Sequence, residues 1–347
     1  MDAPTRRIDS LQAGRALAAF AVLLSHDVQS VEAHVGALPA TVSAILTRGY
    51  LGVDFFFVLS GFIIYFTNAR KRDEPGWLRQ YLRSRLVRIY PPYLPVGIAM
   101  AAAYLALPGL SGGGRSWQWL PSLTLFPAGT PALAVAWTLQ HEMTFYVFMA
   151  AALYLRQVFA ACLVWAVLIL VLGSGIPLAT INLEFLFGIF AAWCYMEGKF
   201  RLPIVQLAVA AAAIAAYFIV GSDAYRMLFG LGMAAIVLPV VRWEKEGRLR
   251  VPGFLVQMGA ESYALYLLHL PILVFTARFC PALGLSQWAA LVALPIPPII
   301  ASKLYYRFYE QPILRRFERP RARAAEPSAE ADQLGNSALE KPPQASS

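Results

Sequence analysis

The sequence predicts an all-α polytopic membrane protein with about ten transmembrane helices and both termini in the cytoplasm. Hydrophobic residues make up 59% of the chain and charged residues only 14%, whereas soluble domains carry about 25% charged residues. Apolar runs close to the roughly 20-residue length that spans a bilayer recur along the whole sequence. These runs are continuously apolar rather than alternating, so the sequence favours helices over a membrane β-barrel.

Ten apolar segments make up the predicted membrane region. They are residues 11–30, 46–67, 90–108, 134–155, 158–173, 180–197, 203–220, 225–241, 254–277 and 287–306. The stretch 158–173 is the weakest of the ten, and 117–135 is the nearest further candidate, so nine or eleven spans are the alternatives. We expect Pro91 and Pro92 to begin the third helix, because proline suits a first helical turn.

The basic residues predict the orientation of the chain in the membrane. With the amino terminus in the cytoplasm, 22 of the 29 Lys and Arg residues fall on the cytoplasmic side. Four fall on the opposite side, namely Arg48, Arg115, Arg226 and Arg278. The net charge of +9 is therefore explained by membrane topology, and nucleic-acid binding is not expected.

The first apolar segment contains two ionisable residues, Arg15 and His26, in the stretch SLQAGRALAAFAVLLSHDV. Ionisable groups inside a membrane helix are costly and are usually retained for function. A secretory signal would also be apolar and near the amino terminus, but an arginine in its apolar region argues against cleavage. We therefore interpret this segment as a membrane helix that carries part of a functional site.

Five ionisable side chains share one predicted depth in the membrane. Counted at 1.5 Å per residue from the cytoplasmic end of each span, they lie at about 21–23 Å in a core of about 30 Å. They are His26, Asp54, Glu142, Glu184 and His269. We expect them to form one polar layer.

The segments that contain Glu142 and His269 carry further polar and aromatic residues. They read WTLQHEMTFY (137–146) and ESYALYLLHLP (261–271). On a helix, Tyr266 and His269 are three residues apart and share a face. These two segments are predicted to be walls of a hydrated cavity.

Seven basic residues gather in residues 70–93, at the predicted cytoplasmic surface. Arg85 and Arg88 are three residues apart and would share a helix face. Arginine suits bidentate contacts with phosphate, so this pair is a candidate phosphate site. The alternative is that these residues serve only as a positive-inside anchor.

The remainder of the chain predicts no further catalytic unit. Residues 319–347 are rich in Pro, Ala, Glu and Ser and are expected to form a disordered cytoplasmic tail after a membrane domain of residues 1–318. The three cysteines, Cys162, Cys194 and Cys280, show neither metal-ligand spacing nor a disulfide framework. No metal site is predicted.

Several motifs resemble those of the membrane-bound acyltransferase-3 superfamily, in particular the group that acylates sugars of exopolysaccharides and lipopolysaccharides. Arg15 and His26 match its Arg-x10-His motif in the first span. The other matching segments are GVDFFFVLSGFII (52–64), RSRLVRIYPPY (83–93), WTLQHEMTFY (137–146), SYALYLLHLP (262–271) and YEQP (309–312). They occur in the family's order, and the resemblance covers about residues 8–318.

The resemblance implies an O-acyltransferase of the bacterial cytoplasmic (inner) membrane. It would take an acyl group, usually acetyl, from cytoplasmic acyl-CoA and deliver it to a hydroxyl of a cell-surface or exopolysaccharide sugar, with no bound cofactor. The implied partners are acyl-CoA, a carbohydrate acceptor that is polymeric or lipid-linked, and proteins of polysaccharide assembly. The acceptor sugar and the acyl chain are not specified by the motifs.

The resemblance, together with the chemistry of the residues, assigns roles to ten side chains. His26 is the general base, since histidine titrates near neutral pH, and Glu142 assists it. Arg85 and Arg88 are expected to bind the phosphates of CoA, while Arg15, about 16 Å along the helix from His26, would line the path of the CoA arm. The predicted substrate-binding residues are Asp54, Trp137, Glu184, Tyr266 and His269.

Two features leave alternatives open. His141 departs from the family pattern and adds a titratable group beside Glu142, which leaves the identity of the base open. Ser25 and Ser60 could carry an acyl group, but neither has neighbours typical of a nucleophile.

The rival function is that of a transporter or flippase for an anionic or glycan substrate, which would also use a polar layer and basic inner loops. A third possible function is that of an inactive partner in polysaccharide assembly.

Overall fold

The computed structural model describes residues 8–107, 116–222 and 225–318, and the regular elements in these ranges are all helices. The predicted tail, residues 319–347, lies outside the described residues. The elements are α1 (Asp9–His34), α2 (Ala40–Thr47), η1 (Arg48–Leu51), α3 (Gly52–Asn68), α4 (Trp77–Ala106), α5 (Trp119–Thr124), η3 (Ala134–Ala136), α6 (Trp137–Tyr154), α7 (Val158–Leu172), α8 (Gly175–Leu178), η4 (Thr180–Asn182), α9 (Leu183–Met196), α10 (Pro203–Val220), α11 (Arg226–Lys245), α12 (Gly253–Ala277), α13 (Gln287–Ala293), α14 (Ile296–Tyr305), the π-helix η6 (Tyr306–Glu310) and α15 (Gln311–Glu318).

Each of the ten predicted apolar segments falls on a helix or on consecutive helices. Within the described ranges, six helical stretches are long and apolar enough to cross a membrane, namely Ala40–Asn68, Trp77–Ala106, Pro203–Val220, Arg226–Lys245, Gly253–Ala277 and Gln287–Phe317. Two shorter apolar helices occupy Val158–Leu172 and Thr180–Met196. The chain is therefore a multi-pass membrane protein, and the number of ten spans stays a prediction.

The outer surface of the bundle carries large apolar side chains. On α7, Leu163 and Val171 are 67% and 75% exposed, and on α10, Ile204 and Ile219 are 82% and 84% exposed. A soluble protein rarely exposes contiguous apolar patches of this kind. These faces suit contact with lipid, while the helical backbone satisfies its own hydrogen bonds.

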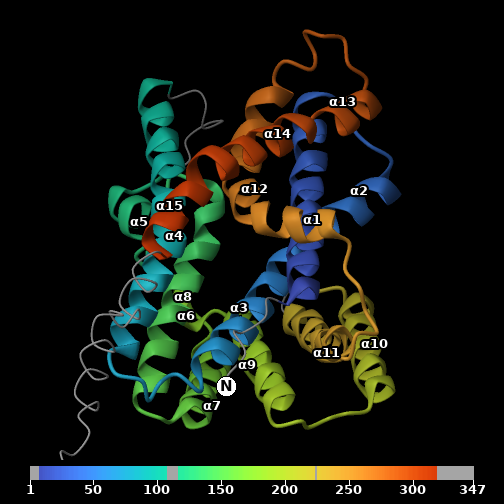
Figure 1. Cartoon of the computed structure of the whole chain (residues 1–347). Helices are drawn as coiled ribbons and strands as arrows, with labels where there is room; N and C mark the ends of the chain where they lie inside the picture. Colours follow the sequence, from blue (N-terminus) through green and yellow to red (C-terminus); the bar gives the residue numbers. More distant parts are fainter. Residues whose placement is uncertain (1–7, 108–115, 223–224, 319–347) are drawn as a thin grey trace, which may run out of the picture.

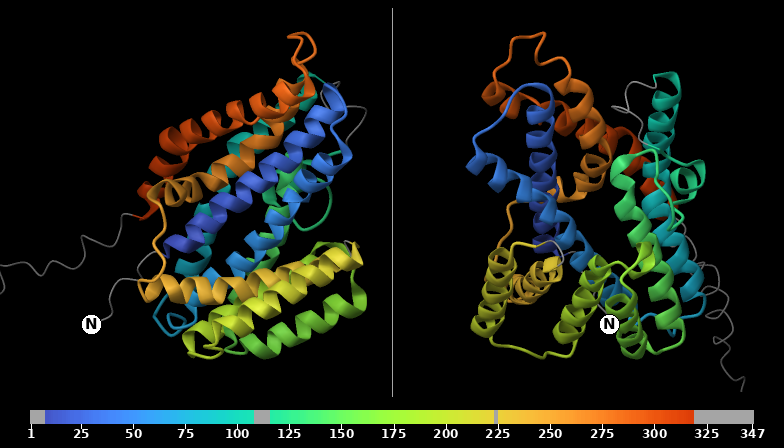
Figure 2. Two further views of the ribbon diagram at one scale, coloured as in Figure 1. Left: turned by 90° about the vertical axis from the view of Figure 1, so that its right-hand side faces the viewer. Right: turned by 180° about the vertical axis from the view of Figure 1, so that it is seen from behind.

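Helix α3 lies at the centre of the packing. It contacts α9 along its length and also α1 and α11, while α1 packs along α12, and α10 packs along α11. Figure 1 shows α1 and α12 side by side above the group formed by α9, α10 and α11, and the two views in Figure 2 show the same arrangement. The candidate site lies where α1, α3, α4, α6 and α12 converge.

Two glycines allow α3 and α9 to approach closely. A Cβ atom at Gly61 would lie 2.0 Å from the Phe185 carbonyl oxygen, and one at Gly188 would lie 2.0 Å from the Val58 carbonyl oxygen. Small residues are typical of close helix crossings in membranes, where helices have little hydrophobic drive to associate. This crossing fixes the relative position of the residues that α3 and α9 contribute near the site.

Helix α4 begins at Trp77 and continues through Pro91, Pro92 and Pro95, so the expectation that Pro91 and Pro92 begin the third helix is wrong. Proline at position 95 removes the amide that would otherwise bond to the Pro91 carbonyl. That carbonyl accepts a hydrogen bond of 3.2 Å from the Tyr309 hydroxyl. A neighbouring element thus replaces a missing helical hydrogen bond, which is how prolines are tolerated in membrane helices.

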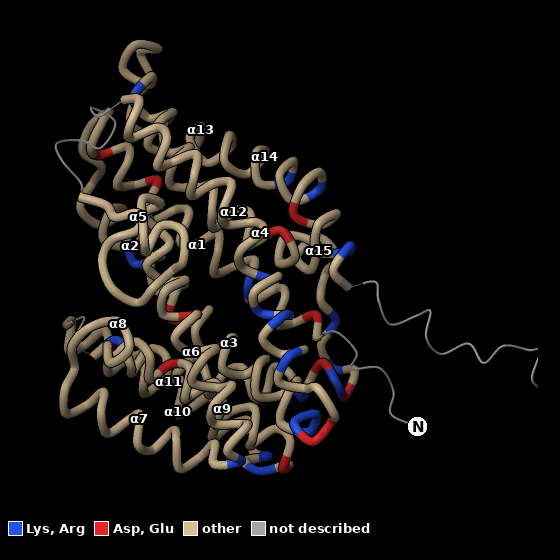
Figure 3. Tube along the Cα trace, turned by 90° about the vertical axis from the view of Figure 1, so that its left-hand side faces the viewer, with Lys and Arg blue, Asp and Glu red and all other residues tan. Residues whose placement is uncertain are grey.

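The charged residues concentrate at one end of the molecule. Figure 3 shows most Lys, Arg, Asp and Glu residues near the end where α1 begins and α15 ends. At this end the Glu244 carboxylate of α11 accepts hydrogen bonds of 2.8 Å from the backbone amides of Asp9 and Ser10. A carboxylate at a helix amino terminus satisfies otherwise unpaired amides and the helix dipole. The loop after α11 therefore lies beside the start of α1.

Candidate active site

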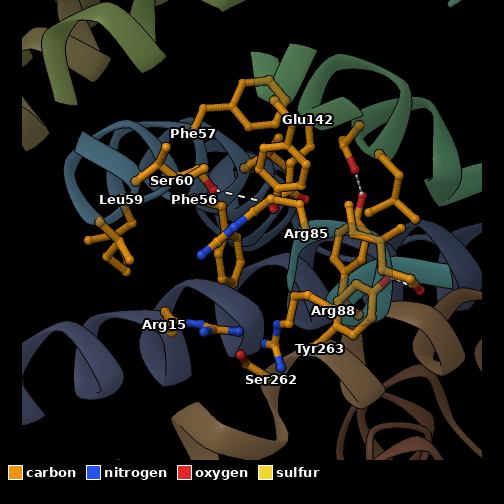
Figure 4. A pocket seen from close by; sticks show the side chains of 18 of the residues that line it. Arg15, Phe56, Phe57, Leu59, Ser60, Arg85, Arg88, Glu142, Ser262 and Tyr263 are labelled. Carbon is orange, nitrogen blue, oxygen red and sulfur yellow. Dashed lines mark hydrogen bonds between the residues drawn. The ribbon is translucent and has the colours of Figure 1, made fainter. Parts of the chain in front are cut away.

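Three predicted arginines and Glu142 line one cavity of about 300 Å³ between α1, α3, α4, α6 and α12. We call this the inner cavity. Arg15 comes from α1, Arg85 and Arg88 come from α4, and Glu142 comes from α6. Figure 4 shows the three guanidinium groups directed into the same space, with Glu142 on the wall that α6 provides. The expectation that Arg85 and Arg88 share a helix face is confirmed.

Glu142 is held by hydroxyl groups of the inner cavity. Its Oε1 accepts a short hydrogen bond from the Tyr146 hydroxyl and a longer one of 3.4 Å from Ser60 Oγ. The Arg85 guanidinium lies 5.8 Å from the centroid of the Tyr146 ring. Ser60, considered as an acyl carrier, thus points at Glu142, whereas Ser25 Oγ donates to the Val22 carbonyl of its own helix.

The three arginines differ in their partners. Arg88 forms an ion pair of 3.3 Å with Glu310, whose side chain is fully buried, and its guanidinium lies 5.3 Å from the Tyr263 ring centroid. Among the described residues, Arg15 and Arg85 have no carboxylate within ion-pair distance. The three arginines therefore have only two carboxylates near them, those of Glu142 and Glu310. The inner cavity keeps an excess of positive charge, which suits an anionic ligand.

His26 lies outside the inner cavity. It lines two other cavities, one of about 440 Å³ that includes Trp137 and His141 and one of about 280 Å³ that includes Tyr50 and Arg226. We call these two together the His26 cavities. Glu142 lines neither of them, and its hydrogen bonds go to Tyr146 and Ser60. The expected pairing of His26 with Glu142 is therefore not what the structure shows, because the two side chains face different sides of the same wall.

Tyr266 and Val53 form that wall, since both line the inner cavity and the smaller of the His26 cavities. The Tyr266 hydroxyl lies 2.6 Å from Thr138 Oγ1 and donates to the Val135 carbonyl at 2.8 Å. These bonds connect α12 to η3 and α6. A substrate that reaches from one cavity to the other must pass this tyrosine.

Asp54 and Glu184 lie behind Arg226 rather than on a cavity surface. Both carboxyl groups are fully buried, and neither residue lines any of the three cavities. Asp54 accepts two hydrogen bonds from Arg226, of 3.1 Å to Oδ1 and 2.5 Å to Oδ2, and Glu184 lies beside Asp54. The Arg226 guanidinium also lies 4.9 Å from the Tyr50 ring centroid. Asp54 and Glu184 thus surround Arg226 at the edge of a His26 cavity, and their contact with substrate stays a prediction.

The predicted site residue Trp137 and its neighbour His141 reach the His26 cavities from α6. Trp137 is 39% exposed and lines both of them, and its ring lies 5.6 Å from the ring of His141 at right angles. His141 Nδ1 lies 2.9 Å from Asn182 Oδ1, while Asn182 Nδ2 donates to the Ile176 carbonyl. His141 and Glu142 are consecutive in sequence but face different cavities, because successive helical residues point about 100° apart.

His269 is almost completely buried, at 1% exposure, and lines none of the three cavities. The predicted direct contact with substrate is therefore not supported by its position. Its Nδ1 donates to the carbonyls of Leu265 and Tyr266 at 3.1 and 2.8 Å. Its ring centroid lies 5.2 Å from that of His26.

Three residues of this region were not identified from the sequence. Arg226 is one of only four basic residues that the sequence predicts on the outer side. Basic residues are scarce there, and this scarcity could have pointed to a function for Arg226. Glu310 lies in the YEQP segment but received no role, and it pairs with Arg88. Asp27, next to His26, is fully buried, and neither carboxyl oxygen has a hydrogen-bond partner among the described residues.

The cysteines and potential metal ligands add nothing to the site. In the part of the chain that the structure describes, Cys162, Cys194 and Cys280 are free, and no group of three His, Cys, Asp or Glu side chains could hold a metal ion. The polar side chains that line the described cavities include histidine, carboxylate, hydroxyl and guanidinium groups.

Comparisons with known proteins show that the sequence is similar to acyltransferases. A family model described as an acyltransferase domain, of the acyltransferase-3 type, matches residues 8–305. The exopolysaccharide production protein ExoZ of Rhizobium meliloti (strain 1021) is 27% identical over 78% of the chain and 91% of its own length. The acyltransferase MdmB of Streptomyces mycarofaciens is 26% identical over 94% of the chain and 97% of its own length. No solved structure matches the chain.

Proposed function

Because the chain belongs to the acyltransferase-3 family and is an acyltransferase for groups other than aminoacyl groups, we propose that it acylates a sugar hydroxyl. The donor is cytoplasmic acyl-CoA, with acetyl as the acyl group, and the acceptor is a glycan of an exopolysaccharide or of the cell surface. The name of the relative ExoZ, an exopolysaccharide production protein, supports this acceptor class. The location is the bacterial inner membrane.

One observation carries the proposal: a cavity lined by three arginines shares a wall with the cavities of a histidine. CoA is a polyanion, and guanidinium groups bind phosphate through paired, charge-assisted hydrogen bonds. The excess positive charge of the inner cavity therefore suits the donor. The His26 cavities contain a base and no excess of arginine, which suits a neutral hydroxyl acceptor.

The reaction takes place where the acyl end of the donor reaches past Tyr266 and Val53 to the acceptor hydroxyl beside His26. His26 removes the proton of the acceptor hydroxyl as its oxygen attacks the thioester carbonyl. The carbon–oxygen ester bond forms, the carbon–sulfur bond breaks, and the proton held by His26 passes to the leaving thiolate of CoA. Glu142 belongs to the donor side of the wall, where it and Tyr146 position the surrounding groups of the inner cavity.

The acceptor contacts come from the walls of the His26 cavities. Trp137 presents an exposed ring to both cavities and offers a flat apolar face for a sugar ring. Arg226 offers donors to sugar oxygens while Asp54 and Glu184 keep it in place. The predicted acidic residues thus act on the acceptor through Arg226.

The test is thiol release from acetyl-CoA by the purified full chain in lipid nanodiscs, supplied with exopolysaccharide oligosaccharides. We expect acceptor-dependent thiol release and a matching acetylated product by mass spectrometry. His26→Ala should reduce the rate at least about a hundredfold, since general-base catalysis contributes about 10²–10⁴-fold. His34→Asn is the matched control, because His34 lies at the end of α1 and lines none of the three cavities.

Two results would overturn the proposal. Wild-type protein that binds oligosaccharide but releases no thiol would favour the transporter or flippase alternative. A fully active His26→Ala variant would show that another group, such as His141, is the base.

A further inference from the structure

The hydrogen bonds of His269 fix the protonation of its ring. Its Nδ1 lies within hydrogen-bond distance of two acceptors, the carbonyls of Leu265 and Tyr266 in the preceding turn of α12. Carbonyl oxygens only accept, so Nδ1 must carry the hydrogen. In the neutral imidazole the other nitrogen, Nε2, then carries a lone pair and is an acceptor.

This acceptor is buried and has no partner among the described residues. His269 is 1% exposed, and its Nε2 makes no hydrogen bond in the described part of the chain. Buried polar atoms in native proteins are nearly always paired, so an unpaired one indicates a function or a partner that forms with the ligand. A neighbouring ring, a bound water or a bound substrate can supply the donor that satisfies Nε2.

His26 is the neighbour that can supply this donor. Two rings lie close to His269, those of His26 at 5.2 Å and Tyr266 at 5.7 Å between centroids. The Tyr266 hydroxyl already donates to the Val135 carbonyl. The planes of the two histidine rings are inclined by 37°. The His26 ring is partly exposed and has a hydrogen bond with the Gln29 side chain. Turning the ring would exchange that partner for the buried Nε2 of His269.

We propose that His269 is the positioning residue for His26. Its Nε2 accepts a hydrogen bond from one ring N–H of His26. The other ring nitrogen of His26 then keeps its lone pair and faces the hydroxyl of the sugar. This inference rests on the proposed role of His26 as the base. It assigns to His269 the task that sequence reasoning gave to Glu142.

The arrangement suits a base inside a membrane. A carboxylate partner would place a negative charge beside His26, and taking such a charge out of water is costly. A neutral imidazole orients His26 without that cost. When His26 accepts the proton of the sugar hydroxyl, it becomes a cation, and its hydrogen bond to His269 becomes charge-assisted and stronger. The bond thus stabilises the charge that develops during the reaction.

Nuclear magnetic resonance of the wild-type protein tests the hydrogen bond directly. The chain has four histidines, so histidine-specific ¹⁵N labelling in bilayers gives few signals, which His34→Asn and His141→Gln assign. We expect one ring nitrogen of His26 to be coupled through a hydrogen bond to His269 Nε2, with His26 in a single tautomer. A His26 ring that samples both tautomers without coupling would overturn the proposal, and this measurement requires no change at His269.

Two substitutions of His269 separate positioning from packing. Gln places an amide oxygen near the position of Nε2, whereas Met fills a similar volume without an acceptor. His269→Met should lower kcat about a hundredfold with both KM values within about twofold, while His269→Gln should retain at least about a tenth of the wild-type kcat. Equal loss in both variants, or a His269→Met kcat close to wild type, would show that His269 only packs α12 against α1.

His26→Ala separates a failure of the proposed function from a failure of the proposed role of His269. If His26→Ala is active, the proposed base is wrong. If His26→Ala is inactive while His269→Met retains wild-type kcat, the proposed function stands and only the positioning role of His269 fails. Where His269→Met does not fold, the ¹⁵N coupling in the wild-type protein decides.

Discussion

Glu142 and His26 line different cavities, and this separation decides what Glu142→Gln should do. Gln keeps the size of the side chain and an oxygen that accepts from Tyr146, but it removes the charge. If that charge stabilised a protonated His26, kcat would fall by about 10²–10⁴-fold. Because the structure places Glu142 among the arginines of the inner cavity, we expect less than about a tenfold loss of kcat and a change in the donor KM.

Steady-state kinetics with acetyl-CoA varied at saturating acceptor would measure this difference. Tyr146→Phe is the matched control, since it removes the hydroxyl that donates to Glu142 and leaves the carboxylate charge. A thousandfold loss of kcat in Glu142→Gln with an unchanged donor KM would contradict the placement of Glu142 on the donor side.

Arg85 and Arg88 share a cavity, but their substitution should have different consequences. Arg85 has no carboxylate partner among the described residues, so Arg85→Ala should raise the donor KM and leave stability close to wild type. Arg88→Ala should also remove the partner of the buried Glu310. An unsatisfied buried polar group costs about 1–3 kcal/mol, so Arg88→Ala should lower the thermal midpoint as well.

Glu310→Gln supplies the control for Arg88. In the Arg88→Ala, Glu310→Gln double variant the buried charge is gone, and much of the lost stability should return while the donor KM stays high. Thermal unfolding in detergent and the donor KM are the two measurements. Equal destabilisation by Arg85→Ala and Arg88→Ala would contradict this division.

Among the helices, α3 and α9 cross at a close contact near the site. A Cβ atom at Gly188 would lie 2.0 Å from the backbone oxygen of Val58, so the helices would have to separate. Overpacking of this kind typically costs about 1–3 kcal/mol. We expect Gly188→Ala to lower the thermal midpoint and to reduce activity, because α3 and α9 carry Asp54 and Glu184, which hold Arg226.

Gly253→Ala is the matched control for this contact. Gly253 begins α12 and has no heavy atom within 4 Å of a Cβ built on it. Its substitution should leave both stability and activity close to wild type. A Gly188→Ala variant as stable as Gly253→Ala would show that α3 and α9 do not pack as closely as described.

The sequence predicted where the helices lie along the chain better than it predicted which helices contact one another. The apolar runs located the elements, because chain length in a membrane fixes the length of a span. The helix rise could place His26, Asp54, Glu142, Glu184 and His269 at a common depth, but depth does not specify direction around the helix axis. In the structure, Glu142 lines the inner cavity and His26 lies beside His269. Asp54 and Glu184 lie together behind Arg226. Which helices meet depends on close contacts such as Gly61 with Phe185, which no periodicity reveals.

Helix α4 shows a second limit of local reasoning. Proline has a strong local preference for helix starts, and Pro91 and Pro92 were expected to begin a helix. Tertiary contacts override that preference, because the hydroxyls of Tyr309 and Tyr305 donate to the carbonyls of Pro91 and Pro92. The donors lie more than 200 residues away in sequence, so the continuous helix could not be inferred from the proline segment alone.

The whole molecule has a charged end and an apolar body, and this asymmetry predicts its orientation. Position 246 follows α11 at the end where α1 begins, and position 286 precedes α13 at the far end of α12. With the start of α1 in the cytoplasm, Glu246→Cys should react with a membrane-impermeant maleimide only in inverted vesicles. Ser286→Cys should react only in intact cells.

The native cysteines set the background of this labelling. Cys194 and Cys280 are buried and Cys162 is partly buried, and the unsubstituted chain gives the reference signal. Labelling of both introduced cysteines from the same side would contradict an arrangement in which α12 crosses the membrane.

The donor site and the base are separate places joined at Tyr266, and the binding of a non-transferable acetyl-CoA thioether distinguishes them, because the analogue binds without reacting. In nanodiscs, His26→Ala should bind the analogue with a Kd within about twofold of wild type while failing to transfer from acetyl-CoA. The Arg15→Ala, Arg85→Ala double variant should bind it at least about tenfold more weakly, since each charge-assisted contact contributes about 1.5–3 kcal/mol. Loss of binding in His26→Ala, or wild-type binding in the double arginine variant, would show that the donor does not bind in the inner cavity apart from His26.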